Sequence, residues 1–150
     1  MDHIRIAFKS LEHHRDLPLP TYASNGASGM DIRACVEGSV TLNPGEIRLI
    51  PTGLAMSIPT GYEAQIRPRS GLALNHGIGM VNSPGTIDSD YRGEVGIILI
   101  NWGNSPVVIR RGDRIAQMVI TRVARAEVVV TGDLDETDRG TGGFGHSGMV

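Results

Sequence analysis

The sequence predicts an all-β protein, built as a jelly-roll-like β-sandwich or barrel. Apolar and polar residues alternate with a period of two in several short segments, which is the pattern of half-buried strands. Clusters of Gly, Pro and Asn separate these segments, as turns between short strands do. The chain has 150 residues, of which 40% are hydrophobic and 20% charged, and this composition is typical of one soluble globular domain.

The expected elements follow from these patterns in chain order. Alternating or apolar segments predict strands at residues 4–8, 30–36, 54–58, 62–66, 95–102, 107–109, 115–120 and 126–130. The segment 95–102 is apolar throughout, which favours a strand covered on both faces. The only helix expected is a turn or two at 70–75, with Ser70 as its N-cap. We expect a β-barrel domain at 1–132 and a flexible, Gly-rich C-terminal arm at 133–150.

Charge and composition limit the classes of partner. The formal net charge is −2, whereas a general nucleic-acid binder carries a basic footprint. No apolar run approaches the ~18 residues of a membrane span, so we expect neither nucleic acid nor membrane as a partner. Cys35 is the single cysteine, which excludes a disulfide framework and favours a reducing, cytoplasmic location.

The segment from Arg139 to Gly148 combines five glycines with one guanidinium, two hydroxyls and one aromatic ring. Glycines let backbone N–H groups converge on an anion, and Arg139 offers a planar fork for phosphate oxygens. Phe144 offers a flat face on which a base can stack. The segment therefore suggests a flap that closes over a nucleotide, and the alternative is a disordered terminal tail.

Two segments of the body carry candidate phosphate chemistry. Pro68-Arg69-Ser70-Gly71 places a guanidinium and a hydroxyl before the expected helix, which suits an anion, although an ordinary N-cap beside a surface arginine is the alternative. In the segment 85–93, Asp88 and Asp90 project from one face if the backbone is extended. Two nearby carboxylates can divide positioning and proton transfer, with Tyr91 at the edge of the same site. The simpler interpretation makes both aspartates loop residues bonded to local backbone.

Two further polar positions lie in segments that look structural. Asn82-Ser83-Pro84-Gly85 suits a type II turn with Pro84 and Gly85 at its centre. Such a turn can read a base through Asn82 and its backbone, or it is simply a hairpin turn. Gln117 interrupts the apolar segment 115–120 and needs a hydrogen-bond partner there. Protein backbone is the simpler partner, and a phosphate oxygen is the other.

Metal-binding side chains are few. Asp31 either supports a hydrated metal ion or pairs with Arg33, and the ion pair is the simpler interpretation. The histidines lack ligand spacing, so we expect no zinc site, and we expect His13 and His14 to be exposed near a loop. Cys35 is expected in a core or interface rather than as a nucleophile, because no partnered histidine is evident.

Together these segments resemble the homotrimeric dUTPase family. All five of its motifs occur in order: Gly29-Met30-Asp31-Ile32-Arg33-Ala34, Arg67-Pro68-Arg69-Ser70-Gly71, 85–97, Arg111-Gly112-Asp113-Arg114-Ile115-Ala116-Gln117 and 139–148. The resemblance implies a jelly-roll-like trimer whose active sites are shared between subunits, with the arm of one subunit closing a site of the trimer. It also implies Mg²⁺-dependent hydrolysis of dUTP to dUMP and pyrophosphate, which limits uracil incorporation into DNA and supplies dUMP for thymidylate synthesis.

The resemblance also implies roles by position. Asp88 matches the carboxylate that activates the attacking water, and Tyr91 matches the ring that excludes a 2′-hydroxyl. Asp31 matches a residue near the water shell of the metal, which takes no direct protein ligand. The other substrate-binding positions implied are Arg69, Ser70, Gly71, Asn82, Gly85, Thr86, Ile87, Gly96, Gln117, Arg139, Phe144, Gly145, His146 and Ser147.

Two other functions stay open at this point. A dCTP deaminase-like enzyme uses a related scaffold, but it needs a group that activates the amino carbon, typically a glutamate in the hairpin region. A non-catalytic β-sandwich binding or regulatory module is the second alternative.

Overall fold

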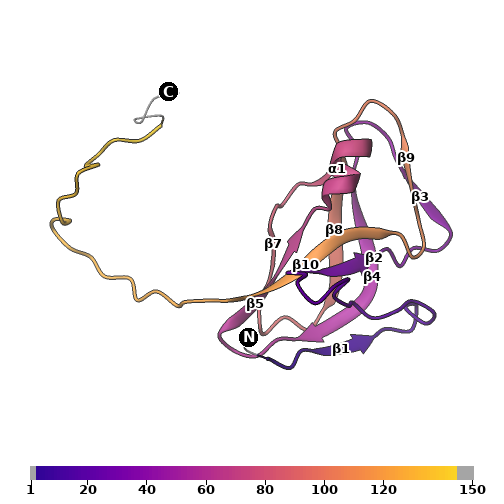
Figure 1. Cartoon of the computed structure of the whole chain (residues 1–150), viewed down its shortest axis with the longest axis horizontal. Coiled ribbons are helices and arrows are strands. Elements are labelled where there is room, and N and C mark those ends of the chain that lie inside the picture. The colour runs from indigo at the N-terminus through magenta and orange to yellow at the C-terminus, as the bar shows by residue number, and fades with distance from the viewer. Residues whose placement is uncertain (1–2, 145–150) are drawn as a thin grey trace.

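Two four-stranded antiparallel β-sheets and one two-stranded sheet form the body of the protein, and an extended arm leaves it (Figure 1). The structure is a computed structural model that describes residues 3–144. One sheet has the strand order β1-β4-β8-β6, the second has β2-β10-β5-β7, and β3 pairs with β9. The elements are β1 (Ala7–Ser10), β2 (Met30–Arg33), β3 (Ser39–Leu42), β4 (Ile47–Ser57), β5 (Tyr62–Arg67), α1 (Ser70–His76), β6 (Ile78–Met80), β7 (Gly85–Ile87), β8 (Glu94–Asn101), β9 (Val107–Arg110) and β10 (Arg114–Arg122).

The core is aliphatic and draws on strands of all three sheets. Its largest fully buried apolar side chains are Ile32, Leu42, Ile50, Ile78, Ile97, Leu99, Ile115 and Met118. Strand β8 buries every second residue, while Gly96 is exposed and Ile98 and Ile100 are half-buried. The expectation of a strand covered on both faces is therefore wrong for this chain, and Trp102 lies beyond the strand with 66% of its surface exposed.

Three other expectations need correction. The helix N-cap is Arg69 rather than Ser70, and no side chain caps the helix, which ends at Gly77 with φ 67°. Residues 126–130 form no strand, since no strand of the same chain lies beside them, and Val128 and Val130 are 90% and 101% exposed. The short strands β3, β6 and β7 were not expected from the sequence.

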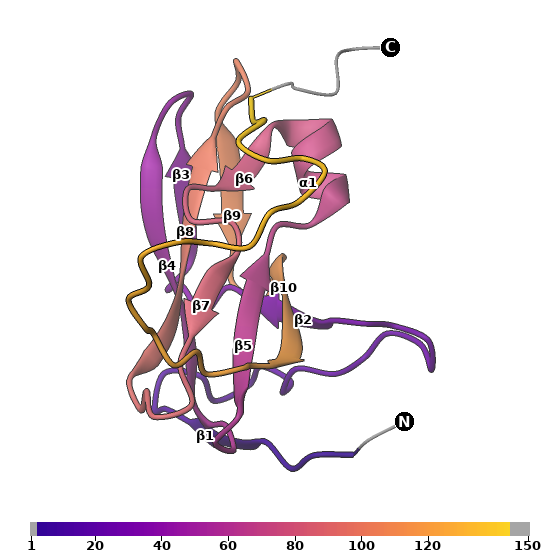
Figure 2. The ribbon, with the colours of Figure 1, turned by 90° about the vertical axis from the view of Figure 1, so that its left-hand side faces the viewer.

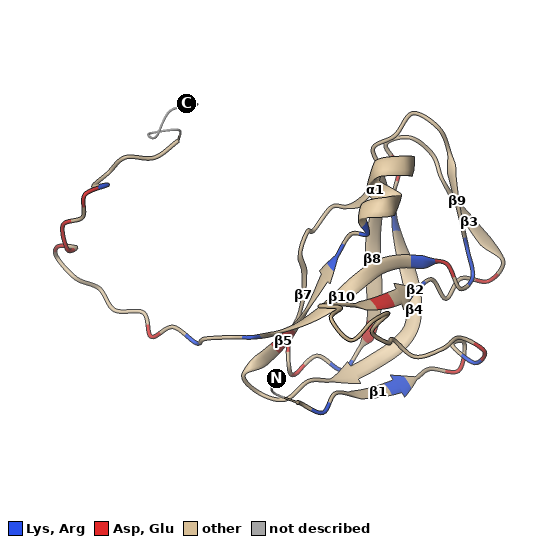
Figure 3. Cartoon of the chain, in the orientation of Figure 1, with Lys and Arg blue, Asp and Glu red and all other residues tan. Residues whose placement is uncertain are grey.

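The arm begins where β10 ends. The N–H of Val123 donates to the carbonyl of Gly61 at 2.9 Å, and this is the last backbone hydrogen bond between the segment and the body among residues 3–144. Residues 122–140 are exposed, and the ribbon runs away from the sheets in Figure 1. Acidic residues lie along the arm (Figure 3). No helix among residues 3–144 has the length and apolar character needed to cross a membrane.

Candidate functional site

The sheet β2-β10-β5-β7 arranges the candidate residues in space. Figure 2 shows these strands side by side, with α1 above the end of β5. Asp31 of β2 lies opposite Gln117 of β10, and Gln117 lies opposite Arg67 of β5. The three side chains therefore form one row across the sheet, and Arg69 follows directly on the chain.

Asp31 is the centre of the charged contacts in this row. Its Oδ2 lies 3.0 Å from Arg114 Nη1, and its Oδ1 lies 3.2 Å from Arg69 Nε. Arg69 Nη1 also donates to the carbonyl of Arg114 at 3.0 Å. The expected pair with Arg33 is wrong, because Arg33 donates to the carbonyl of Gly112 at 2.7 Å. Two guanidiniums from other elements thus neutralise the Asp31 carboxylate.

The contact between Asp31 Oδ1 and Arg69 Nε is an ion pair without a hydrogen bond. Both atoms are buried and neither has a hydrogen-bond partner in the described chain, although they lie 3.2 Å apart. The Asp31 side chain is only 16% exposed. A buried carboxylate oxygen without a hydrogen bond is costly unless something donates to it, so Oδ1 is suited to accept a hydrogen bond from a water molecule.

A groove of about 560 Å³ leads away from this row. It is lined by Arg69, Leu72, His76, Pro106, Val107, Val108, Ile109, Arg110, Asp113, Arg114 and Ile115. Arg69, Arg110 and Arg114 outnumber Asp113 and the adjacent Asp31, so the groove keeps a small net positive charge, which favours a polyanionic ligand. Ser70 and Gly71 are exposed beside it, at the start of α1.

Gln117 is the middle residue of the row that it forms with Asp31 and Arg67. The sequence favoured a backbone partner for Gln117 over a phosphate oxygen, but Gln117 is exposed on β10 and its side chain has no hydrogen-bond partner among residues 3–144. Met118 and Ala116, its neighbours in the strand, are the buried residues. The amide of Gln117 is therefore available to a ligand.

The hairpin around β7 carries the second group of candidates. Gly85 and Ile87 are buried, while Thr86 and Asn82 are exposed. The expected type II turn is absent, because Gly85 belongs to β7 and is not among the glycines with positive φ. The Ser83–Pro84 peptide bond is cis.

Asp88 and Tyr91 follow β7 in a tight turn. The N–H of Tyr91 donates to the carbonyl of Asp88 at 3.2 Å, so the extended geometry expected for 88–90 is not formed. Both Asp88 and Asp90 are exposed, and within residues 3–144 neither carboxylate accepts a hydrogen bond, so the local-backbone alternative is also wrong. Tyr91 Oη donates to the carbonyl of Glu94 at 3.0 Å, and 46% of the tyrosine is exposed.

Within one chain, Asp88 lies far from the arginines that surround Asp31. Gly85 pairs with Ile66, and Ile87 pairs with Ala64, so β7 runs away from the end of β5 that carries Arg67. Asp88 therefore lies beyond Ala64, about 10 Å or more along the strand direction from Arg67, at roughly 3.3 Å per residue. A single subunit does not bring Asp88 to the arginines.

The arm candidates lie away from the body. Arg139 Nε donates to the carbonyl of Gly142 at 2.7 Å, and Phe144 is exposed. Gly145, His146 and Ser147 lie outside the described residues. The arm as described contacts neither the arginine row nor the Asp88 turn of its own chain (Figure 1).

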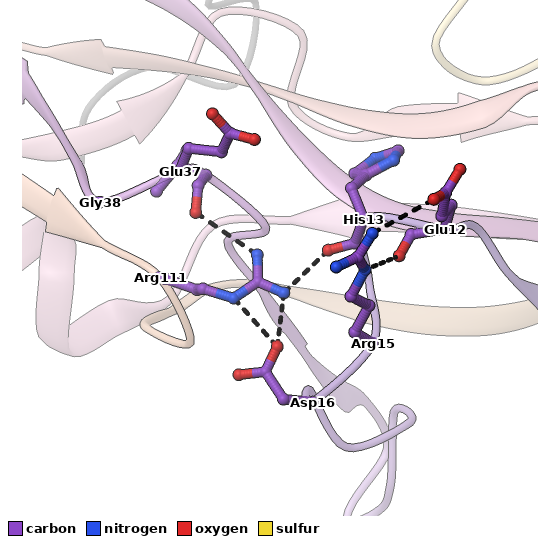
Figure 4. Close-up of a pocket in the computed structure, with 8 residues that line it drawn as sticks. Glu12, His13, Arg15, Asp16, Glu37, Gly38 and Arg111 are labelled. Atoms are coloured by element: carbon purple, nitrogen blue, oxygen red, sulfur yellow. Dashed lines mark hydrogen bonds and ion pairs between the residues drawn. The ribbon is translucent and has the colours of Figure 1, made fainter.

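A second hollow, of about 530 Å³, surrounds Arg111 (Figure 4). Arg111 Nη2 donates to Asp16 Oδ1 at 2.6 Å and to the carbonyls of His13 and His14 at 2.8 and 3.1 Å. The Arg111 guanidinium lowers the pKa of the Asp16 carboxyl, and Asp16 raises the pKa of Arg111. Because its donors are engaged within the protein, Arg111 fastens the N-terminal loop to the body and offers no cation to a ligand.

The residues around this loop correct another expectation. His13 is exposed as expected, but His14 is buried, and burial together with nearby Arg111 lowers the pKa of His14. Cys35 is a core residue, and its Sγ donates to the carbonyl of His13 at 3.1 Å. Among the described residues, no three His, Cys, Asp or Glu side chains come together as a metal site.

The sequence did not single out Arg114 or Glu94. Arg114 pairs with Asp31 because β10, at whose start it lies, is next to β2 in the sheet. Glu94 contacts both His13 of the N-terminal loop and Gly53 of β4. Both lie inside motifs that were recognised, so their position in the motif was the available signal. Their partners lie far away in the chain and could not be read from it.

The fold and the arginine-lined groove define a β protein suited to a phosphorylated ligand. The dUTPase family model matches residues 15–148, and the chain belongs to the dUTPase family. A deoxyuridine 5'-triphosphate nucleotidohydrolase of Caldanaerobacter subterraneus subsp. tengcongensis is 58% identical over 146 residues, which cover 97% of this chain and 99% of that protein. One from an Anaeromyxobacter species is 61% identical over 132 residues, which cover 88% of each.

Solved structures agree with the jelly-roll-like fold. The dUTPase of Staphylococcus bacteriophage 80alpha with dUpNHpp has a TM-score of 0.88 at 26% identity, over 97% of this chain and 99% of that one. A mutant dUTPase of phage phi11 of S. aureus, described with a structural Mg(II) ion, has a TM-score of 0.79 at 23% identity, over 89% and 100% of the two chains.

Proposed function

We propose that this protein hydrolyses dUTP to dUMP and pyrophosphate, which limits uracil in DNA and supplies dUMP for thymidylate synthesis. Family membership gives the reaction class, and one observation carries the assignment of the catalytic group. Asp88 is an exposed carboxylate that no hydrogen bond of the described chain occupies, and it begins the turn that ends at Tyr91. Such a carboxylate is free to accept a proton from water.

The proposed reaction is one in-line displacement. Water attacks the α-phosphorus while Asp88 accepts its proton, and the bond from the α-phosphorus to the oxygen shared with the β-phosphorus breaks. Pyrophosphate leaves with that oxygen, and the phosphate of dUMP keeps the oxygen from water. Charge neutralisation and positioning supply most of the catalysis in such reactions.

In this proposal two parts of the protein bind dUTP: one binds the phosphates and the other binds the base and the sugar. We assign the phosphates to Arg69, Ser70, Gly71 and Gln117, beside the cationic groove. We assign the uracil to the hairpin residues Asn82, Gly85, Thr86, Ile87 and Gly96. The Tyr91 ring packs against the deoxyribose, which leaves no space for a 2′-hydroxyl.

Mg²⁺ fits this site as a hydrated ion. No group of three or more His, Cys, Asp or Glu side chains in residues 3–144 could hold it, and we propose that phosphate oxygens and water would supply its ligands. The buried Asp31 Oδ1 lacks a hydrogen bond and would accept one from a water of the ion. When bound, the ion neutralises charge on the phosphates.

A homotrimer would unite the separated groups. Leu49 of β4 pairs with Ile98 of β8, and the N–H of Val81 reaches the carbonyl of Ile98 at 3.4 Å. Leu49 and Val81 are 68% and 52% exposed, and Trp102, which follows β8 and packs against Gly79 of β6, is 66% exposed. An exposed apolar face of this kind marks an interface, and we propose that it packs against two other copies.

The arm completes the proposed site from another subunit. Its residues 123–144 span at most about 75 Å if fully extended, at ~3.4 Å per residue, which is enough to reach a neighbouring subunit. We assign Arg139 and the distal residues Gly145, His146 and Ser147 to the γ-phosphate, and Phe144 to the uracil face. The free thiol of Cys35 fits a reducing interior, and we place the enzyme in the cytoplasm.

Pyrophosphate release tests this function. The wild-type chain should release pyrophosphate from dUTP with Mg²⁺ and far less from dCTP, dTTP or UTP, and it should release no ammonia from dCTP. Asp88→Asn should nearly abolish turnover while dUpNHpp still binds. Asp90→Asn changes a neighbouring exposed carboxylate and should keep most activity. An active Asp88→Asn enzyme would show that another group activates the water.

A further inference from the structure

Strand β4 contains a bulge next to the Tyr91 turn. It pairs regularly with β8 as far as Pro51, opposite Gly96, and pairs again at Ala55, opposite Glu94. Residues 52–54 therefore lie opposite Val95 alone. Bulges of this kind redirect side chains and terminate regular pairing, and they occur often beside active sites.

The Glu94 carboxylate holds this bulge. The N–H of Gly53 donates to Glu94 Oε1 at 2.7 Å, and the His13 ring lies 2.9 Å from the same oxygen through Nε2. Because an ionised carboxylate only accepts hydrogen bonds, His13 donates from Nε2. The carbonyl of Gly53 accepts a hydrogen bond from the N–H of Leu11 at 2.8 Å, so the bulge is tied to the N-terminal loop on both sides.

The main chain of Glu94 holds Tyr91. Tyr91 Oη donates to the Glu94 carbonyl at 3.0 Å. The tyrosine also lies directly over Gly93, where a Cβ would collide with its hydroxyl. The position of the ring is therefore set by the backbone at 93–94, and that backbone is fixed in turn by the Glu94 side chain on the bulge.

We propose that Glu94 is a positioning residue for sugar selectivity. It acts through Tyr91, and the proposal rests on the proposed function, in which the Tyr91 ring faces the deoxyribose. His13 supports Glu94 from the N-terminal loop. The loop at 11–14, the β4 bulge and the Tyr91 turn then form one connected unit around a single carboxylate oxygen.

The test is the ratio of kcat/KM for dUTP to kcat/KM for UTP. Glu94→Ala leaves the Gly53 N–H unpaired and frees the backbone under Tyr91, and we expect the ratio to fall on the order of tenfold. Glu94→Gln keeps a neutral acceptor, so its ratio should fall by a smaller factor, about threefold. In both variants kcat/KM for dUTP should change less than kcat/KM for UTP.

Glu46 supplies the matched control. It also accepts a backbone N–H, from Asn43 at 2.9 Å, and a basic side chain, from Arg48 at 2.6 Å, but it lies in the turn between β3 and β4. Glu46→Ala should leave the dUTP to UTP ratio unchanged. An equal fall in this variant would overturn the proposal, because the effect would then be general.

Tyr91→Ala separates this proposal from the function on which it rests. An unchanged ratio in Tyr91→Ala would mean that the proposed sugar contact is wrong. A lowered ratio in Tyr91→Ala together with wild-type ratios in both Glu94 variants would refute the positioning role alone. If Glu94→Ala does not fold, the ratio of Glu94→Gln decides, and a value equal to wild type counts against the proposal.

Discussion

Replacing Gly53 by alanine tests how tightly the β4 bulge is packed. Gly53 has φ 68°, a left-handed conformation that costs a residue with a Cβ about 1–2 kcal/mol. An added Cβ would lie 2.8 Å from both Cys35 Sγ and His14 Cβ. Crowding of this kind in a packed interior costs about 1–3 kcal/mol, so the total loss of unfolding free energy is about 2–5 kcal/mol.

Gly61→Ala is the matched control for this substitution. Gly61 also has positive φ, 87°, but no atom lies within 4 Å of its added Cβ. Its cost should therefore be the backbone cost alone, about 1–2 kcal/mol. The difference between the two variants isolates the crowding, and at roughly 2–4 °C per kcal/mol it corresponds to about 2–12 °C in Tm.

Thermal unfolding followed by circular dichroism at one protein concentration measures this difference. Gly53→Ala should melt below Gly61→Ala, and both should melt below the wild type. Equal Tm values for the two variants would refute the reasoning, because they would mean that Cys35 and His14 move aside without cost.

Three further predictions concern assembly, the arm and pH. Leu49→Asp should shift the protein from trimer to monomer in light scattering, whereas Leu74→Asp, on an 87% exposed side chain of α1, should not. Deleting the chain from Arg139 onward should lower kcat on the order of 10³-fold without changing Tm, and full activity would contradict closure by the arm. The pKa of His14 is lowered from 6.5 in the folded chain, so the unfolded chain takes up the proton first. Unfolding free energy should fall as pH drops below about 6.5, and urea titrations should find this slope reduced in His14→Gln.

The motifs made the candidate site readable from the sequence. Glycines, arginines and aspartates at fixed local spacing indicate phosphate chemistry, because the residue types themselves carry it. Alternation likewise predicted β5, and apolar runs predicted the long strands β8 and β10. Local patterns and motifs therefore determined the fold class, most of the strands and which residues are candidates for the site.

The partners of those groups were decided by the tertiary structure. Asp31 pairs with Arg69 and Arg114 rather than the nearby Arg33, because strand register brings distant cations to it. His13 is exposed while its neighbour His14 is buried, since the loop packs against Gly53 and Cys35.

Residues 126–130 show the same limit. Their β-branched side chains favour a strand, yet they remain exposed because a strand also needs a neighbour to pair with. Pairing, register and burial depend on segments far apart in the chain, and the free energy that selects them comes from contacts that no local pattern contains.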